Sequence, residues 1–256
     1  MTLIVKPGFN GMTDADAIAY VNAVEAADGQ LLEFAVGKAI NDFVLGCKAD
    51  GIWSAIKASC ILAGARTLGG ALVPLAGVAP TNVGGLFVSG DYNRKTGLVG
   101  NGSTKYLDSN RANNADPQNS KHAAAFVSAA ASNVSYFFGD SEASGCTLAA
   151  RTSVSQLIFR VNTATNGNIN PGGEATGLLG VSRNESSSFI ARANGTNSNL
   201  LINSTAPTST TIQIFRSGNL PTNARIAFYS IGEFLALAQL DTRVTALITA
   251  IGAAIP

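Results

Sequence analysis

The second half of the chain consists of short apolar or alternating runs that are separated by Gly, Asn and Ser. The runs cover residues 123–128, 134–138, 147–151, 156–161, 177–182, 188–193, 199–202, 212–216 and 225–231. The polar, glycine-rich residues 162–174 are expected to form a surface loop. The pair Asn194-Gly195 is a strong hairpin turn, because both residues accept a positive φ. Many short strands at near-regular spacing, without helices between them, predict an antiparallel β-sandwich or jelly roll.

The first 64 residues have the spacing of helices instead. After an extended arm, Thr13 offers an N-cap for a helix that ends at Asp28-Gly29. Apolar residues then recur at helical spacing over residues 31–47 and again over residues 52–60, with Gly64 as a C-cap. The sequence therefore predicts three N-terminal helices.

From Ala65 the spacing changes to that of strands. Residues 66–68 and 71–73 are predicted to form two short strands around Gly69-Gly70. Residues 98–99 and 105–107 are predicted to form a second hairpin, with a glycine turn between them. The same stretch has a GxxxxG pattern, but a P-loop needs Lys directly after the second Gly, and Ser103 stands there.

A last helix is predicted over residues 234–251. Its apolar residues are spaced three, four, three and four apart, as in a coiled-coil seam: Leu237, Leu240, Val244, Leu247 and Ile251. The pattern lasts only about two heptads and Ile248 widens the stripe, so we expect this helix to pack on its own fold. The predicted fold is α+β: an N-terminal arm and helical docking region (1–64), a β-sandwich (65–231) and a C-terminal helix (232–256).

Composition and charge exclude several classes of partner. Charged residues make up 13 % of the 256 residues and the net charge is +1, so nothing predicts binding to nucleic acid or to an anionic membrane. No apolar run approaches the ~18 residues of a membrane span, and residues 1–8 lack the pattern of a signal peptide. Cys47, Cys60 and Cys146 form no CxxC pair, so we expect buried free thiols and assembly in a reducing cytoplasm.

No catalytic constellation is predicted. His122 is the only histidine and no GxSxG surrounds any serine, so we expect a hydrogen-bonded structural imidazole and no enzyme. Most acidic residues of the β-region stand at turns, although a carboxylate pair that hydrolyses glycosides stays open as an alternative.

Two kinds of ligand site are considered among the loops. Oxygen ligands for calcium could come from Asp91, Asn93, Asp108, Asn110 and Asp116, but without EF-hand spacing we expect turn residues and no cofactor. A glycan site needs exposed aromatic rings beside amides, for which Tyr92, Tyr106 and Tyr136 are the candidates.

Several strings resemble small structural proteins of tailed bacteriophages. They are VEAADGQLLE at residues 24–33, ADGIWSAIK at 49–57, GARTL at 64–68 and RIAFYSIGE at 225–233. The run GLVGNGSTKYLDSN at 97–110 resembles the opening strands of laminin-G or concanavalin-A-like sandwiches in such proteins. The resemblance implies a virion component with a lectin-like sandwich, made in the host cytoplasm.

From this resemblance we expect a non-enzymatic structural protein exposed on the virion, in a tail fibre or tail appendage, with a role in recognising a host-surface glycan. A capsid decoration (cement) protein is the alternative, and a carbohydrate-active enzyme is the remoter one. The expected partners are other virion proteins and further copies of the chain, with a trimer as the leading state. Glycan contacts are expected at Tyr92, Asn93 and Arg94 or in the loop 110–119, because loops carry recognition on rigid β-scaffolds.

Overall fold

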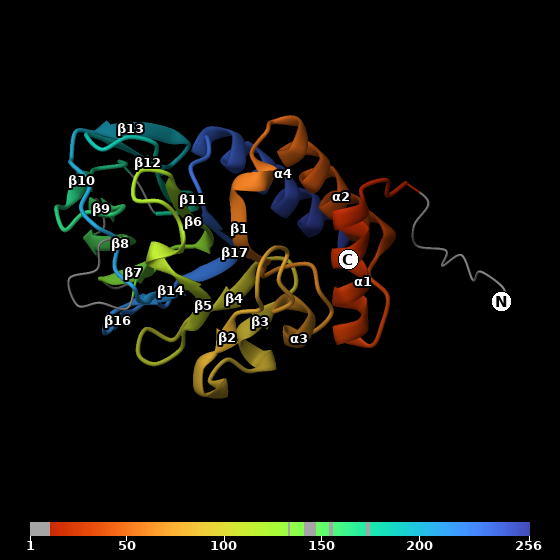
Figure 1. Cartoon of the computed structure of the whole chain (residues 1–256). Coiled ribbons are helices and arrows are strands. Elements are labelled where there is room, and N and C mark those ends of the chain that lie inside the picture. Colours follow the sequence, from red (N-terminus) through yellow and green to blue (C-terminus); the bar gives the residue numbers. More distant parts are fainter. Residues whose placement is uncertain (1–10, 133, 141–146, 154–155, 173–174) are drawn as a thin grey trace.

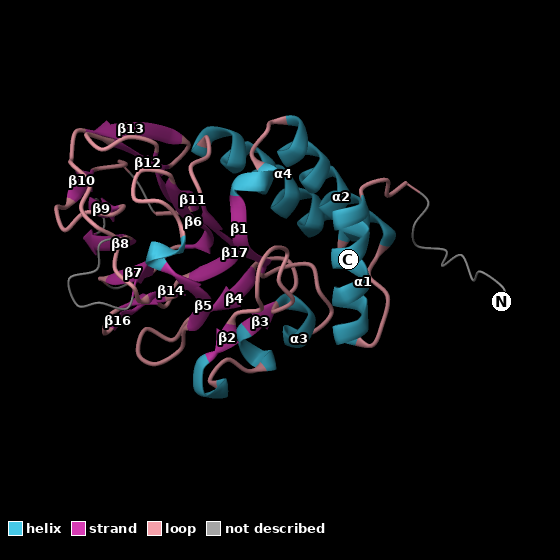
Figure 2. Cartoon of the chain, in the orientation of Figure 1, coloured by secondary structure: helices cyan, strands magenta, loops and turns pink. Residues whose placement is uncertain are grey.

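The computed structural model describes residues 11–132, 134–140, 147–153, 156–172 and 175–256. Two antiparallel sheets lie face to face, and the helices gather beside one of them (Figures 1 and 2). We call the sheet next to the helices the inner sheet and the other one the outer sheet. The fold is therefore an α+β arrangement of a β-sandwich with N-terminal helices and a C-terminal helix, which confirms the predicted fold class.

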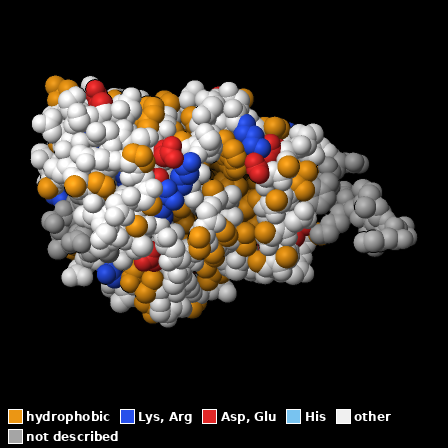
Figure 3. Space-filling view, in the orientation of Figure 1, with side chains coloured by type: hydrophobic (Ala, Val, Ile, Leu, Met, Phe, Trp, Pro, Cys, Tyr) orange, Lys and Arg blue, Asp and Glu red, His pale blue; other side chains and the backbone are white. Residues whose placement is uncertain are grey.

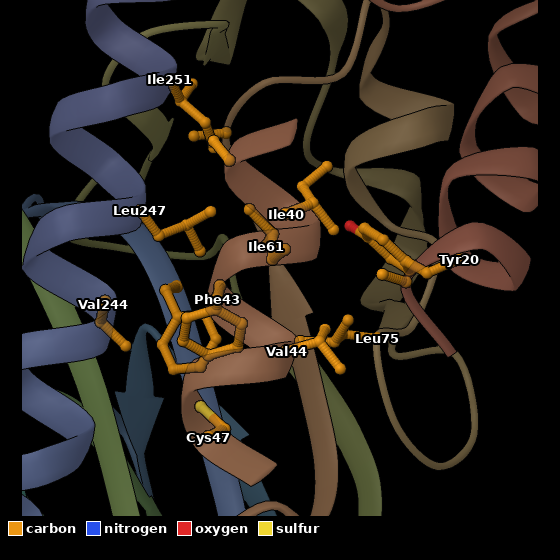
Figure 4. Close-up of a cluster of buried hydrophobic side chains, with 14 of the residues drawn as sticks. Tyr20, Ile40, Phe43, Val44, Cys47, Ile61, Leu75, Val244, Leu247 and Ile251 are labelled. Carbon is orange, nitrogen blue, oxygen red and sulfur yellow. The ribbon is translucent and has the colours of Figure 1, made fainter. Parts of the chain in front are cut away.

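The helical layer contains α1 (Ala15–Asp28), α2 (Phe34–Ala49) and α4 (Leu237–Ala254), and α2 packs along α4. Asp14, rather than the predicted Thr13, is the N-cap of α1, because its carboxylate accepts hydrogen bonds from the backbone amides of Asp16 and Ala17. The apolar stripe of α4 is buried within the chain, and Val244 and Ile251 are fully inaccessible. Figure 4 shows Val244 and Leu247 of this stripe beside Phe43 of α2, with Ile40 of α2 next to Tyr20.

The inner sheet has the strand order β13-β12-β11-β6-β17-β4-β3, and β1 also pairs with β17. Its strands are β1 (Ile56–Ile61), β3 (Tyr92–Asn93), β4 (Gly97–Val99), β6 (Lys121–Ala129), β11 (Gly177–Arg183), β12 (Phe189–Ala193), β13 (Thr196–Leu200) and β17 (Arg225–Gly232). Asn194 and Gly195 both have a positive φ between β12 and β13, which confirms the predicted turn.

The outer sheet has the order β10-β9-β8-β7-β14-β5-β2. Its strands are β2 (Thr81–Asn82), β5 (Leu107–Ala112), β7 (Ser135–Asp140), β8 (Leu148–Ser153), β9 (Gln156–Arg160), β10 (Gly167–Ile169) and β14 (Thr211–Ile214). A separate hairpin pairs β15 (Arg216–Ser217) with β16 (Leu220–Pro221). Strand β10 lies inside the segment that was expected to be a loop.

Side chains of β6 alternate between two hydrophobic clusters. Ala123, Ala125 and Val127 face the outer sheet, whereas Ala124 and Phe126 face the helices. A strand has a side-chain period of two, so a strand in the middle layer must be apolar on both faces. This explains why β6 is a near-continuous apolar run.

The structure corrects the prediction of a third N-terminal helix. Residues 52–60 form a 3₁₀ turn at Trp53–Ala55 and then strand β1, which pairs with β17. The Ser59 hydroxyl donates a 2.6 Å hydrogen bond to the Tyr229 carbonyl, and Gly64 has a φ of +89° in the loop after the strand. An apolar run of this length is compatible with a helix or with a buried strand. Here it forms a strand, because its backbone pairs with β17.

Both predicted hairpins between residues 65 and 108 are also wrong. The first is a single helical turn, α3 (Leu68–Ala71), because the Thr67 hydroxyl caps the amide of Gly70. In the second, β4 belongs to the inner sheet and β5 to the outer sheet, so the glycine turn connects two sheets. A Cβ on Gly100 would lie 2.1 Å from the Thr222 carbonyl oxygen, so glycine is required at this crossing.

The surface carries few charges. Figure 3 shows scattered blue and red side chains on a face that is mostly uncharged, with apolar side chains between the helices and the sandwich. Among the described residues, no helix has the length and apolar character needed to cross a membrane.

Candidate functional site

The predicted ligand residues Tyr92, Asn93 and Arg94 lie where β3 meets the helical layer. The Tyr92 hydroxyl donates a 2.8 Å hydrogen bond to the Ala65 carbonyl, and burial raises its pKa. Asn93 is exposed, but its side-chain oxygen accepts the amides of the turn that follows it. The structure thus places all three side chains in contacts within the chain, and a ligand role for them stays a prediction.

Arg94 forms part of a joint between the helices and the sandwich. Its guanidinium holds the Glu33 carboxylate in two hydrogen bonds of 3.1 and 2.7 Å, and Arg66 reaches the same carboxylate at 2.8 Å. Partial burial alone would raise the pKa of Glu33, but the hydrogen bonds and charges of the two arginines lower it. We call Glu33, Arg66 and Arg94 the arginine joint.

The loop 110–119 is likewise occupied by internal contacts. Asp116 is buried between Arg111 and Lys121, and the Lys121 ammonium donates a 2.7 Å hydrogen bond to the Asn113 carbonyl. Burial would raise the pKa of Asp116, but the hydrogen bond from Arg111 and the charge of Lys121 lower it. These carboxylate and amide groups stabilise the loop.

His122 is the structural imidazole that the sequence predicts. The carbonyl of Glu233 can only accept, so Nδ1 carries the proton and donates to it, while Nε2 accepts from the Ser230 hydroxyl at 2.8 Å. Burial lowers the pKa of His122 to about 4. The ring is fully inaccessible, so it cannot serve as a general base for an external substrate.

The other sequence candidates are spread over the molecule. Asp91 pairs with Lys105, and Asp108 accepts the hydroxyl of Thr211. Within the described residues, no three His, Cys, Asp or Glu side chains come together as metal ligands. Tyr106 lies under the Arg216 guanidinium, 4.1 Å from its ring centre, and Tyr136 is half-buried on β7. Cys47 and Cys60 are buried free thiols, as predicted, and Cys146 lies outside the described residues.

The surface hollows differ in chemical character. One groove lies between α2 and α4, and its lining consists largely of alanine together with Phe34 and Leu247. The groove has two parts, with volumes of about 190 and 400 Å³. A polar pocket of about 440 Å³ lies instead between α4, the start of β11 and the β12–β13 turn. It is lined by Thr176, Gly177, Leu178, Asn194, Gly195, Asp241 and Thr245. It is a shallow depression that is open to solvent rather than an enclosed cavity.

Asp241 is the most constrained side chain of the polar pocket. It is only 9 % exposed, and Arg192 holds one of its oxygens through a 2.7 Å hydrogen bond. The other oxygen accepts the Thr245 hydroxyl at 3.1 Å, and Arg192 in turn donates to Asn197 at 2.8 Å. A carboxylate accepts about four hydrogen bonds, so this fixed group has capacity left toward a ligand.

The other lining residues include an asparagine and two glycines whose backbone is accessible. Asn194 is held by a 3.3 Å hydrogen bond from its amide nitrogen to the Pro171 carbonyl. A Cβ on Gly177 or Gly195 would meet no atom within 4 Å, so glycine keeps the backbone accessible there. Leu178 also belongs to the lining, but its side chain is buried in the core, so a ligand meets mainly polar groups. Carboxylate, amide and hydroxyl groups together suit a ligand that carries several hydroxyl groups.

The sequence does not predict this pocket. It predicts the turn Asn194-Gly195 only as a hairpin connection, and it places Asp241 within the helix expected over residues 234–251. The lining comes from segments about 20 and 45 residues apart, so only the packing of α4 on the inner sheet brings them together.

No protein-family model matches the chain, and no curated protein matches it. Similar solved structures include a sialidase of Trypanosoma rangeli in complex with a difluoro-KDN sugar, with 11 % identity and a TM-score of 0.51, over 78 % of this chain and 33 % of that chain. The binding domain of botulinum neurotoxin serotype D has 12 % identity and a TM-score of 0.46, over 75 % and 51 %. Domain 4 of a GH43 extracellular arabinanase from Geobacillus stearothermophilus, in complex with arabinotriose, has 12 % identity and a TM-score of 0.39, over 68 % and 82 %.

The chain thus spans about a third of the sialidase and about half of the toxin domain. The likeness to the sialidase supports the β-sandwich fold. At 11 % identity it extends to the fold alone.

Proposed function

We propose that this chain is a non-enzymatic structural protein of a tailed bacteriophage virion, and that its sandwich binds a host-surface glycan in the polar pocket. The observation that carries the glycan part is the pocket itself, in which Asp241 is fixed by Arg192 and Thr245 beside Asn194 and two open glycines. A preformed site loses little freedom when a ligand binds, so few contacts suffice for useful affinity.

Two further points support this choice of ligand. The neighbours in solved structures include proteins in complex with sugars, which is consistent with a glycan ligand for the same fold, although the fold alone does not assign one. The groove between α2 and α4 is lined by alanine and by Lys38, Asp42 and Arg243, and these charged side chains are already held in ion pairs, so the groove suits a sugar less well. The polar pocket offers hydroxyl, amide and carboxylate groups to which the hydroxyl groups of a sugar can bind.

The virion part of the proposal rests on the resemblance of residues 24–33 and 225–233 to phage structural proteins. We assign the helical layer to attachment on other virion proteins, because it exposes Leu31, Phe34 and Leu45. Single exposed apolar residues are ordinary, but these three lie along α2 and the turn before it, over residues 31–45. A tail appendage with the sandwich pointing outward is the favoured placement.

Glycan binding is tested with purified full-length protein and a panel of immobilised neutral polysaccharides (glucan, galactan and mannan). We expect at least one polymer to bind. Replacing Thr245 by Arg should then fill the pocket and abolish binding. Replacing Thr249 by Arg, one turn further along α4 and also exposed, is the matched control and should leave binding unchanged. Equal binding by both variants would place the site elsewhere, and silence over the whole panel would count against glycan binding.

Placement on the particle is tested by electron microscopy of virions labelled through an antibody against this chain. Label confined to the tail would support the appendage. Label arrayed over the head lattice would favour a decoration protein instead.

A further inference from the structure

The polar pocket presents one kind of charge. Asp241 is the only charged side chain among its lining residues, within the described part of the chain. The cation that balances it, Arg192, is as little exposed as Asp241, at 9 % each, and binds Asp241 and Asn197. Arg192 does not belong to the lining, so a ligand in the pocket contacts the carboxylate of this pair.

The other polar groups of the pocket are neutral. Thr176 and Thr245 offer hydroxyl groups, and Asn194 offers an amide. Within the described residues, the Thr176 hydroxyl has no partner of its own, so it can donate to or accept from a ligand. None of these groups compensates the charge of an acidic ligand.

We infer that the pocket selects a neutral sugar unit and rejects the matching sugar that carries a carboxylate. This inference rests on the glycan-binding function proposed above and names its ligand class. Hydroxyl groups of a neutral sugar can donate hydrogen bonds to the free lone pairs of Asp241, and such bonds to an ionised acceptor are stronger than neutral ones.

A carboxylated sugar meets the opposite situation. Two carboxylates about 4 Å apart near a protein surface repel one another, and the ion pair with Arg192 offsets part of this repulsion, so we expect the affinity to change by about tenfold. The acidic ligand also loses its hydration without gaining a cation in return. Uronic acids and sialic acids are therefore excluded by charge, even where their size fits.

The test compares neutral polymers with uronate counterparts that differ at C6 of each unit: glucan with glucuronan, galactan with galacturonan, and mannan with mannuronan. Binding of the full-length protein is measured at low ionic strength, where charge effects are largest. We expect the neutral polymer that binds to have about tenfold higher affinity than its uronate. A uronate that binds as tightly as its neutral counterpart would overturn this inference while glycan binding stands. Failure of all six polymers to bind would instead reject the proposed function, and the inference with it.

Two variants test the assignment to Asp241. Asp241→Asn keeps the shape but removes the charge, so the preference for the neutral polymer should fall below about threefold. Because Arg192 then loses its counter-charge, this variant could unfold, which thermal unfolding will detect. Thr176→Lys adds a cation at an exposed position of the same pocket and leaves the ion pair intact. It should bring the uronate to equal or higher affinity, and an unchanged preference in this variant would contradict the inference.

Discussion

His122 makes the stability of the fold depend on pH between about 5 and 7, where carboxyl groups contribute little. It is the only histidine of the chain, and burial lowers its pKa from 6.5 to about 4. An unfolded chain exposes the imidazole, which then takes up a proton below its ordinary pKa. The folded chain does not, because the ring is inaccessible and held neutral by Glu233 and Ser230.

The direction and size follow from this difference in proton binding. Stability is complete above pH 6.5 and falls as the pH is lowered toward 4, because only the unfolded state gains a proton. Between pH 7 and pH 5 the expected loss is about 2 kcal/mol. Carboxyl groups such as Asp14 and Glu33, whose pKa is lowered by their partners, add little in this window, since their ordinary values are 3.8 and 4.5.

The assay is urea unfolding at pH 7, 6 and 5, followed by circular dichroism. His122→Gln is the matched control, because its amide can still donate to Glu233 and accept from Ser230 but does not titrate. Wild type should lose about 2 kcal/mol of unfolding free energy over this range, and the variant less than about 0.5 kcal/mol. Equal loss in both proteins, or none in wild type, would refute the assignment of a buried neutral imidazole.

Three further predictions concern the packing of the layers. Glu33→Gln removes the charge that holds the arginine joint and should lower the unfolding free energy by about 1–3 kcal/mol, measured by urea unfolding; no change would mean that the joint adds nothing to stability. Val244→Asp combined with Leu247→Asp places two carboxylates in the buried stripe of α4 and should abolish the fold in circular dichroism. A folded monomer would instead assign the stripe to an oligomer interface. Gly97→Ala puts a Cβ 2.3 Å from a carbonyl oxygen of β17 at a φ of +92°, and should cost more than about 2 kcal/mol in thermal unfolding; a variant as stable as wild type would contradict this.

The sandwich could be predicted because its strands carry their signal locally. The predicted run 225–231 and the strand Arg225–Gly232 differ by one residue, and the turn at Asn194-Gly195 was located by residue type alone. The predicted type of an element was wrong where a distant segment determines it. The apolar spacing of β1 predicts a helix, but the segment forms a strand because it pairs with β17, about 170 residues later.

The candidate site could not be predicted for a related reason. Tyr92 and Arg94 have the residue types of a glycan site, but their partners Ala65 and Glu33 lie in segments whose proximity the sequence does not reveal. In the polar pocket, by contrast, the residue types gave no sign of a site and the packing creates one. Asp241 lies within the predicted helix 234–251, and only its ion pair with Arg192 makes it a fixed ligand group.

Binding of a glycan in the polar pocket can be mapped directly by NMR. ¹⁵N-labelled protein is titrated with an oligosaccharide cut from the neutral polymer that binds in the panel. We expect the amide signals of Gly177, Gly195 and Thr245 to shift together and to saturate with one affinity. Shifts that cluster around Asn93 instead, or that leave the pocket amides unchanged, would contradict it.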